Sequence, residues 1–482
     1  MLNYRKFALR RLASLSTKYL PFADVASEKV PLSQLLRLSL FQVTVGMALV
    51  LLVGTLNRVM IVELNVPASL VAGMLALPLL FAPFRTLIGY KSDTHVSALG
   101  LRRIPYIWKG TLAQFGGFAI MPFALLVLSG YGEAVDAPRW IGYSSAALAF
   151  LLVGAGVHMV QTIGLALATD LVEEEEQPKV VGLMFVMLLA GMVVSALVYG
   201  ALLEAYSPGR LIQVIQGSAV VTVALNLFAM WNQEARSRER AAQMEVAPPP
   251  LPFSEAMSTL LAQPNMLRLL LVIALGTFGF GMADVLLEPY GGQALGFSVA
   301  DTTKLTALLA AGTLAGFGIA SRSLAAGGSP ENMAMYGAAI GIPGFAAIIL
   351  SSLGGGSPMF LIGTLITGLG AGLFGHATLT ASIRRAPKDR IGLALGAWGA
   401  VQATAAGIGV ALAGIVRDAI LSTQDAGSPD HAPYNVVFTI EILFLALAIF
   451  LVLPMAFRAR RARAEVFRTR KTTIQTHSAE VS

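Results

Sequence analysis

The sequence predicts an all-α integral membrane protein with twelve transmembrane helices arranged in two six-helix bundles. Of its 482 residues, 56% are hydrophobic and only 13% are charged, whereas soluble domains carry about 25% charged residues. Such a chain lacks the polar surface that water requires, so the composition excludes a soluble enzyme, a nucleic-acid-binding protein and a disordered protein. A membrane-spanning helix needs about 20 apolar residues, and roughly twelve stretches meet this requirement.

The expected helices form two groups of six. Those of the first group are 38–62, 68–90, 105–129, 139–169, 180–203 and 208–231, and those of the second are 266–288, 300–324, 332–353, 359–383, 391–416 and 434–457. Between the groups, charged residues are followed by the proline-rich run APPPLP, which is typical of a solvated linker. The expected organisation is therefore an N-terminal segment 1–37, a bundle 38–231, a linker 232–264, a bundle 265–457 and a basic tail 458–482.

The basic residues predict that both termini face the cytoplasm. All but six of the 34 Lys and Arg residues fall on one side of these spans, which is the positive-inside bias of a cytoplasmic face. The exceptions are Arg139, Arg210, Lys304 and Arg417 on the opposite side, and Arg58 and Arg85 inside helices. We expect the basic tails to contact anionic membrane lipids, so the net charge of +7 does not require nucleic acid as a partner.

Polar residues inside the expected helices are candidates for function, because an ionisable group in the bilayer costs roughly 2.5–3.5 kcal/mol. The first helix carries Asn57, Arg58 and Glu63, the second carries Arg85, and the seventh carries Asp284 and Glu288. The simplest interpretation is that Arg58 pairs with Asp284 or Glu288 and holds the two bundles together. The alternative is a proton- or substrate-linked switch at the same residues.

Two histidines lie deep in equivalent helices of the two halves, His158 in the fourth and His376 in the tenth. Nearby glycines leave space beside each imidazole for a flat macrocycle, and a neutral imidazole can be the axial ligand of a metal in a tetrapyrrole. The alternative is that each histidine hydrogen-bonds to a neighbouring helix, with Gln161 as the partner of His158.

No enzymatic motif is present. The sequence has no cysteine, which excludes disulfides and thiolate metal sites. It has no phosphate-binding Gly-x4-Gly-Lys-Ser/Thr motif, so we expect neither a bound nucleotide nor catalytic residues. The pairs Gly312/Gly316 and Gly368/Gly372 predict close helix packing.

Two six-helix groups with a central linker resemble the major facilitator superfamily. The loop 89–103 contains Gly89, Asp93, Gly100, Arg102 and Arg103, and is similar to the superfamily's loop motif between helices 2 and 3. In that motif the aspartate holds a neighbouring helix end and the arginine pair faces acidic groups. Here the stretch between Asp93 and Gly100 is longer than usual.

Longer stretches resemble the PucC/LhaA family of phototrophic bacteria, also called the bacteriochlorophyll delivery family. They include LRLSLFQVTVGMALVLLVGTLNRVMIVEL in the first helix, FAPFRTLIGYKSDTH (81–95), LRRIPYIWKG (101–110), LLEPYGGQALGFSV (286–299), GAWGAVQATAAG (396–407) and Arg417-Asp418. The similarity extends from about residue 20 to 457. Within the family, the sequence is more similar to the LhaA branch, which serves the core antenna LH1, than to the PucC branch, which serves LH2.

The resemblance implies a non-enzymatic assembly factor that delivers bacteriochlorophyll a to antenna polypeptides in the inner, intracytoplasmic photosynthetic membrane. The implied partners are the antenna α and β polypeptides, the reaction centre–LH1 core and bacteriochlorophyll synthase. For such a cargo, His158 and His376 would be axial ligands of the pigment magnesium. Trp398 and Gln402 share one helix face and would stack on or hydrogen-bond to the macrocycle, although Trp398 is equally compatible with helix packing. A secondary transporter of a small solute and a pigment-free assembly scaffold remain the alternatives.

Overall fold

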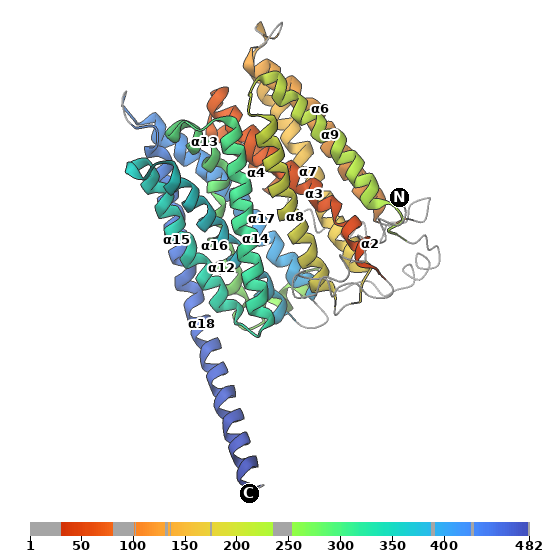
Figure 1. The fold of residues 1–482 in the computed structure, drawn as a ribbon, viewed down its shortest axis with the longest axis vertical. Helices are drawn as coiled ribbons and strands as arrows, with labels where there is room; N and C mark the ends of the chain where they lie inside the picture. Colours follow the sequence, from red (N-terminus) through yellow and green to blue (C-terminus); the bar gives the residue numbers. More distant parts are fainter. Residues whose placement is uncertain are drawn as a thin grey trace. The chain divides into compact units, whose positions relative to one another are not determined.

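The computed structural model describes residues 30–80, 101, 103–130, 134, 136–173, 176–234, 253–386, 391–425 and 429–480. Every regular element in these residues is a helix (Figure 1). The prediction of an all-α protein is therefore confirmed.

The helices of the first half begin with a membrane segment in four parts: α2 (Leu32–Leu38), α3 (Leu40–Leu49) and the π-helical turns η2 (Val50–Leu56) and η3 (Val59–Glu63). They continue with α4 (Ala68–Leu80), α6 (Ile104–Ser129), α7 (Arg139–Asp170), α8 (Gln177–Leu202) and α9 (Pro208–Met230). The π-helical turns widen the helix around Asn57 and Arg58, and such turns occur often at functional positions.

The second half begins with α11 (Phe253–Leu261), followed by α12 (Met266–Gly281) and α13 (Ala283–Leu295), which together form one interrupted membrane segment. The remaining elements are α14 (Val299–Ala325), α15 (Pro330–Leu350), the π-helical turn η5 (Ser351–Gly355), α16 (Gly356–Arg385), α17 (Ile391–Ser422) and α18 (Ala432–Glu480). Figure 1 shows the C-terminal part of α18 projecting beyond the helices of its own unit.

Ten segments of the described residues are long and apolar enough to cross a membrane. One of them, Pro330–Arg385, contains both α15 and α16, and α4 is an additional apolar helix that is shorter within the described residues. These elements account for the twelve expected helices. The chain is therefore a multi-pass membrane protein.

Three expected boundaries differ from the structure, because hydropathy detects only the apolar part of a helix. The first helix begins at Leu32 instead of residue 38, and the last continues to Glu480 through the region expected to be a tail. Helix α11 lies inside the expected linker. Its apolar residues recur every three to four positions, and Met257 and Leu260 pack on the cluster that includes Trp398.

Helix ends coincide with local signals in the sequence. The hydroxyl of Ser207 accepts a hydrogen bond from the backbone N–H of Arg210 at 3.1 Å, and Ser329 caps α15 in the same way through Asn332. A proline follows each serine at the first helical position, where its missing N–H costs nothing.

Glycines allow helices to approach closely at the positions where the sequence predicted it. A Cβ atom at Gly372 would lie 2.0 Å from the carbonyl oxygen of Thr313, and one at Gly316 would lie 2.2 Å from that of Leu369. The backbones of α14 and α16 are therefore in direct contact, which confirms the prediction for Gly312, Gly316, Gly368 and Gly372.

The chain forms two compact units. Unit 1 comprises Met1–Val66, Leu77–Pro248 and Phe297–Ala307, and unit 2 comprises Pro67–Ala76, Pro249–Gly296 and Leu308–Ser482. Each unit therefore includes a short segment from the opposite half of the sequence, which the expected bundles 38–231 and 265–457 did not include.

Candidate functional site

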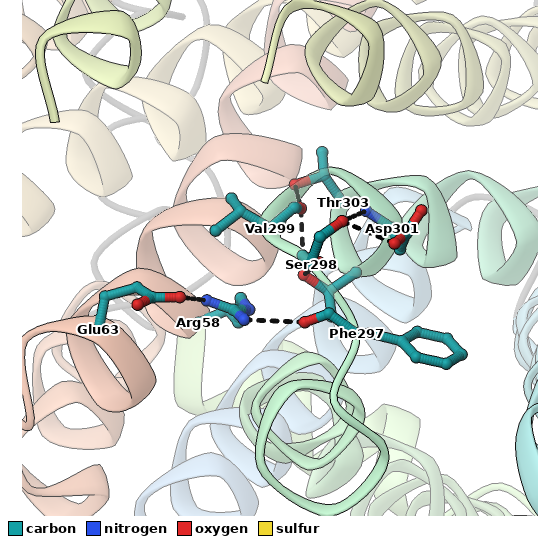
Figure 2. Close-up of polar contacts among 8 residues, drawn as sticks. Arg58, Glu63, Phe297, Ser298, Val299, Asp301 and Thr303 are labelled. Atoms are coloured by element: carbon teal, nitrogen blue, oxygen red, sulfur yellow. Dashed lines mark hydrogen bonds and ion pairs between the residues drawn. The ribbon is translucent and has the colours of Figure 1, made fainter. Parts of the chain in front are cut away.

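The buried arginine of the first membrane segment is held at two points within unit 1. Arg58 lies between η2 and η3 and is only 3% exposed. Its guanidinium forms an ion pair with Glu63, one helical turn further along the chain. It also donates a hydrogen bond of 3.0 Å to the carbonyl oxygen of Phe297 (Figure 2). The two contacts balance the charge and fix the direction of the side chain.

The start of α14 is ordered beside this arginine. Ser298 donates to the carboxylate of Asp301 at 2.6 Å and accepts from its backbone N–H at 3.1 Å, which makes a reciprocal cap of the helix (Figure 2). Two turns inside the membrane segments, the hydroxyls of Thr55 and Thr303 are 3.1 Å apart. These contacts tie residues 297–303 to the first membrane segment.

The expected partner of Arg58 was wrong. The sequence predicted an ion pair with Asp284 or Glu288, but the structure pairs Arg58 with Glu63. The reason is local: a π-helical turn brings a residue five positions away onto the same side of the helix, and no sequence pattern marks that turn. Asn57 is fully buried beside Arg58, whereas Arg85 falls outside the described residues.

Asp284 and Glu288 lie on α13, directly after the interruption of the seventh membrane segment. Glu288 is 3% exposed, whereas Asp284 is exposed. Sequence reasoning missed a third acid of this region, Glu441 on α18, whose carboxylate accepts a hydrogen bond of 2.6 Å from the backbone N–H of Ala283. The available signal was a lone acidic residue in the otherwise apolar segment 434–457.

His376 lies on α16 with an aromatic ring against one face of its imidazole. The ring centroids of His376 and Phe317 are 4.1 Å apart at an interplanar angle of 51°. The imidazole is half-buried, and its Nδ1 has no hydrogen-bond partner among the described residues. A Cβ atom at Gly375 or Gly318 would meet nothing within 4 Å. Open space therefore adjoins the histidine on both α16 and α14.

Trp398 is packed into the helical core of unit 2. It is 9% exposed, belongs to a cluster with Leu269 and Leu379, and donates from Nε1 to the hydroxyl of Thr378 at 3.3 Å. Because the indole is enclosed in this way, its faces serve the helix packing that the sequence had left open as an alternative. Gln402, one turn further on α17, is half-buried.

The two predicted histidines belong to different units. His158 and Gln161 are half-buried residues of α7 in unit 1, whereas His376, Trp398 and Gln402 belong to unit 2. Among the described residues, no three His, Asp or Glu side chains are grouped so that they could hold a metal ion by themselves. A tetrapyrrole metal needs only one axial ligand from the protein, so this finding leaves each histidine as a separate candidate.

The loop motif is described only in part. Gly89, Asp93, Gly100 and Arg102 lie outside the described residues. Arg103 is 6% exposed and donates from Nε to the carboxylate of Asp170 at the end of α7, at 2.9 Å. Glu234 accepts from the backbone N–H groups of Arg103 and Ile104 at 3.0 Å. The start of α6 is thus fixed by acidic groups at the ends of two other helices.

Comparison with known families identifies the chain. The family model described as PUCC protein matches residues 55–460. The chain belongs to the PUCC protein family. It is 70% identical over 463 residues to Protein PucC of Rhodobacter capsulatus, which covers 95% of this chain and 100% of that protein. This high identity to a protein named PucC favours the PucC branch over the LhaA branch that the sequence motifs favoured.

A more distant relative within the PucC family's range is the Bacteriochlorophyll synthase 44.5 kDa chain of Rhodobacter capsulatus. It is 28% identical over 421 residues, which cover 86% of this chain and 93% of that protein. Its printed name associates that relative with bacteriochlorophyll.

Solved structures establish the fold. A bacterial homologue of the human lysosomal transporter Spinster matches with a TM-score of 0.63 at 16% identity and covers 87% of this chain and 95% of its own. A bacterial homologue of the iron transporter ferroportin matches with a TM-score of 0.64 at 15% identity, covering 87% and 97%. At such identities the likeness concerns the fold alone. This member of the PucC family has the major facilitator superfamily fold.

Proposed function

We propose that this protein carries bacteriochlorophyll a within the membrane and delivers it to light-harvesting antenna polypeptides. The observation that supports the proposal best is the environment of His376. Its half-buried imidazole has no hydrogen-bond partner at Nδ1 among the described residues, and open space adjoins it at Gly375 and Gly318. Membership of the PucC family and the bacteriochlorophyll-associated name of one relative support the same cargo.

The residues at His376 suit a magnesium tetrapyrrole in three respects. A neutral imidazole offers one lone pair to the pigment magnesium. Phe317 restricts the rotation of the imidazole by contact with its ring, although the hydrogen-bond partner that usually orients a ligating histidine is not among the described residues. Glycine-lined helix surfaces admit a flat macrocycle. Of the residues predicted for this role, His376 therefore has the most suitable surroundings.

The proposed role is non-enzymatic. The pigment enters and leaves through the apolar helix surface, because its long hydrocarbon tail is already soluble in lipid. The proposed partners are the antenna α and β polypeptides, the reaction centre–LH1 core and bacteriochlorophyll synthase, in the inner photosynthetic membrane of a bacterium with both chain termini in the cytoplasm. His158, with Gln161 nearby on α7, is the second proposed pigment ligand, and Gln402 is a proposed contact of the macrocycle.

The test is pigment retention by the purified protein. The chain is produced in pigment-making cells that lack antenna polypeptides and purified in mild detergent. We expect near-infrared absorption that elutes with the protein in a fixed ratio. His376→Leu should lose most of this absorption, whereas the control His431→Leu, outside the membrane segments, should retain it.

The opposite results would reject the proposal in different ways. A colourless but folded wild-type protein would favour an assembly scaffold or a transporter of a small solute. Equal pigment content in wild type and His376→Leu would leave pigment carriage intact but would remove His376 from the binding site.

A further inference from the structure

An interruption in the seventh membrane segment is joined to a buried acid of α18. Helix α12 ends at Gly281 and α13 begins at Ala283. At this point the backbone N–H of Ala283 donates to Oε1 of Glu441 at 2.6 Å instead of continuing the helical ladder. Helices α12 and α18 are in backbone contact one turn away, because a Cβ atom at Gly279 would lie 3.0 Å from the backbone nitrogen of Leu445. The carboxylate of Glu441 is therefore fixed at the interruption.

The second carboxylate oxygen of Glu441 is unsatisfied. Glu441 is 0% exposed, and Oε2 has no hydrogen-bond partner among the described residues. A fully buried carboxylate oxygen without a partner is costly, and in native proteins such a group usually contacts a proton, an ion or a water molecule. This orphan oxygen is an observation separate from the hydrogen bond of Oε1.

A second acid adjoins Glu441. Asp284 is the residue after Ala283, and its carboxylate is close enough to interact electrostatically with that of Glu441. Neither acid forms an ion pair with a basic residue in the described part of the chain. Two carboxylates close together in a membrane segment cannot both carry an uncompensated charge.

The other ionisable groups on the helices packed around α18 have different surroundings. Arg417 on α17 is held by Asp418, Gln293 and Tyr434, and Glu331 on α15 pairs with Arg385 of α16. Glu288 is buried one turn further along α13, Arg268 and Tyr336 lie on α12 and α15, and Tyr290 donates to the carbonyl oxygen of Ile348. No basic side chain of this set forms an ion pair with either acid.

We propose that Glu441 and Asp284 form a binding site for one monovalent cation, a proton or a sodium ion, at the interruption of the seventh membrane segment. The cation bridges the orphan Oε2 of Glu441 and the carboxylate of Asp284, and leaves one net negative charge beside the N-terminus of α13, where a helix dipole favours it. Interrupted membrane helices bind cations in this way in transporters. The inference does not depend on pigment carriage.

Infrared difference spectroscopy of the purified full-length protein in lipid nanodiscs tests the site. In sodium-free buffer we expect the carbonyl-stretch band of a protonated carboxylic acid. Glu441→Gln should lose this band, and Asp284→Asn should shift or lose it. Both variants keep the shape of the side chain, and the glutamine oxygen can still accept from Ala283. Glu288→Gln, one turn away on the same helix, is the matched control and should keep the band.

Titration with sodium chloride distinguishes the two cations. Loss of the wild-type band on addition of sodium chloride, but not of choline chloride, would identify a sodium ion that displaces the proton. A band unaffected by sodium would identify a proton site. The proposal would be overturned by a wild-type protein with neither the band nor a sodium-dependent melting temperature, or by a band that survives in both variants. Because wild type and Asp284→Asn suffice for this decision, poor folding of Glu441→Gln would not prevent it.

Discussion

The carboxylate of Asp418 on α17 accepts a hydrogen bond of 2.7 Å from the backbone N–H of Ser69, which lies 349 residues earlier in the chain. The oxygen caps the first turn of α4 from outside that helix. A Cβ atom at Gly414, one turn before Asp418, would lie 2.7 Å from the carbonyl oxygen of Ala68. Within unit 2, the segment Pro67–Ala76 is thus attached to α17 by a cap and by a close backbone contact.

Replacement of Asp418 should destabilise unit 2 through two losses. Asp418→Ala removes the cap of α4, which is worth about 0.5–2 kcal/mol, and the ion-pair partner of Arg417, whose side chain is only 8% exposed. We expect a melting temperature several degrees lower in detergent, and a smaller decrease for Asp418→Asn, which keeps a cap acceptor. The exposed Asp425→Ala is the control. Equal melting temperatures for Asp418→Ala and Asp425→Ala would contradict the capping role.

The Arg58–Glu63 pair should respond asymmetrically to mutation. Glu63→Ala leaves a cation that is 3% exposed without its counter-charge, a change that costs about 3–5 kcal/mol for a fully buried pair and less here because Glu63 is 37% exposed. Arg58→Met removes the charge itself and leaves mainly the carbonyl oxygen of Phe297 unpaired, at about 1–3 kcal/mol.

Thermal unfolding of the single and double variants measures this asymmetry. We expect Glu63→Ala to be the less stable single variant, and the double variant to resemble Arg58→Met alone. The exposed Glu204→Ala serves as the control. A double variant less stable than both single variants would mean that Arg58 is not the buried charge that determines the cost.

Contact between α14 and α16 should depend on glycine. Gly372→Ala places a Cβ atom 2.0 Å from the carbonyl oxygen of Thr313, and the helices must separate to admit it, at about 1–3 kcal/mol. Gly399→Ala, at a position with nothing within 4 Å, should not lower the melting temperature. An unchanged melting temperature for Gly372→Ala would show that α14 and α16 can move apart without cost.

The space beside His376 should accept a side chain but then exclude pigment. Gly375→Leu enters open space, so we expect an unchanged melting temperature together with a several-fold loss of co-purified bacteriochlorophyll. Gly116→Leu, at an equally open position in unit 1, should retain both properties. Normal pigment content in Gly375→Leu would place the pigment elsewhere on the protein.

The candidate residues differed in how far the sequence could define their roles. His376 and Arg58 were visible as polar residues in apolar segments, because an ionisable group in a membrane helix is rare enough to be noticed by itself. Glu441 met the same criterion and was overlooked. The partner of each residue was not visible: Arg58 binds Glu63 through a π-helical turn, and Glu441 binds the backbone of Ala283.

The sequence by itself determined that this chain is an all-helical membrane protein, where most of its helices lie and to which family it belongs. These properties follow from apolar length, basic-residue distribution and local capping residues such as Ser207 and Ser329, which are encoded in consecutive residues. Only the tertiary structure decided that Trp398 is enclosed, that Gly375 is open and that Glu441 meets a helix interruption. Such contacts depend on how each helix is rotated and packed against its neighbours, and apolar length contains no information about rotation.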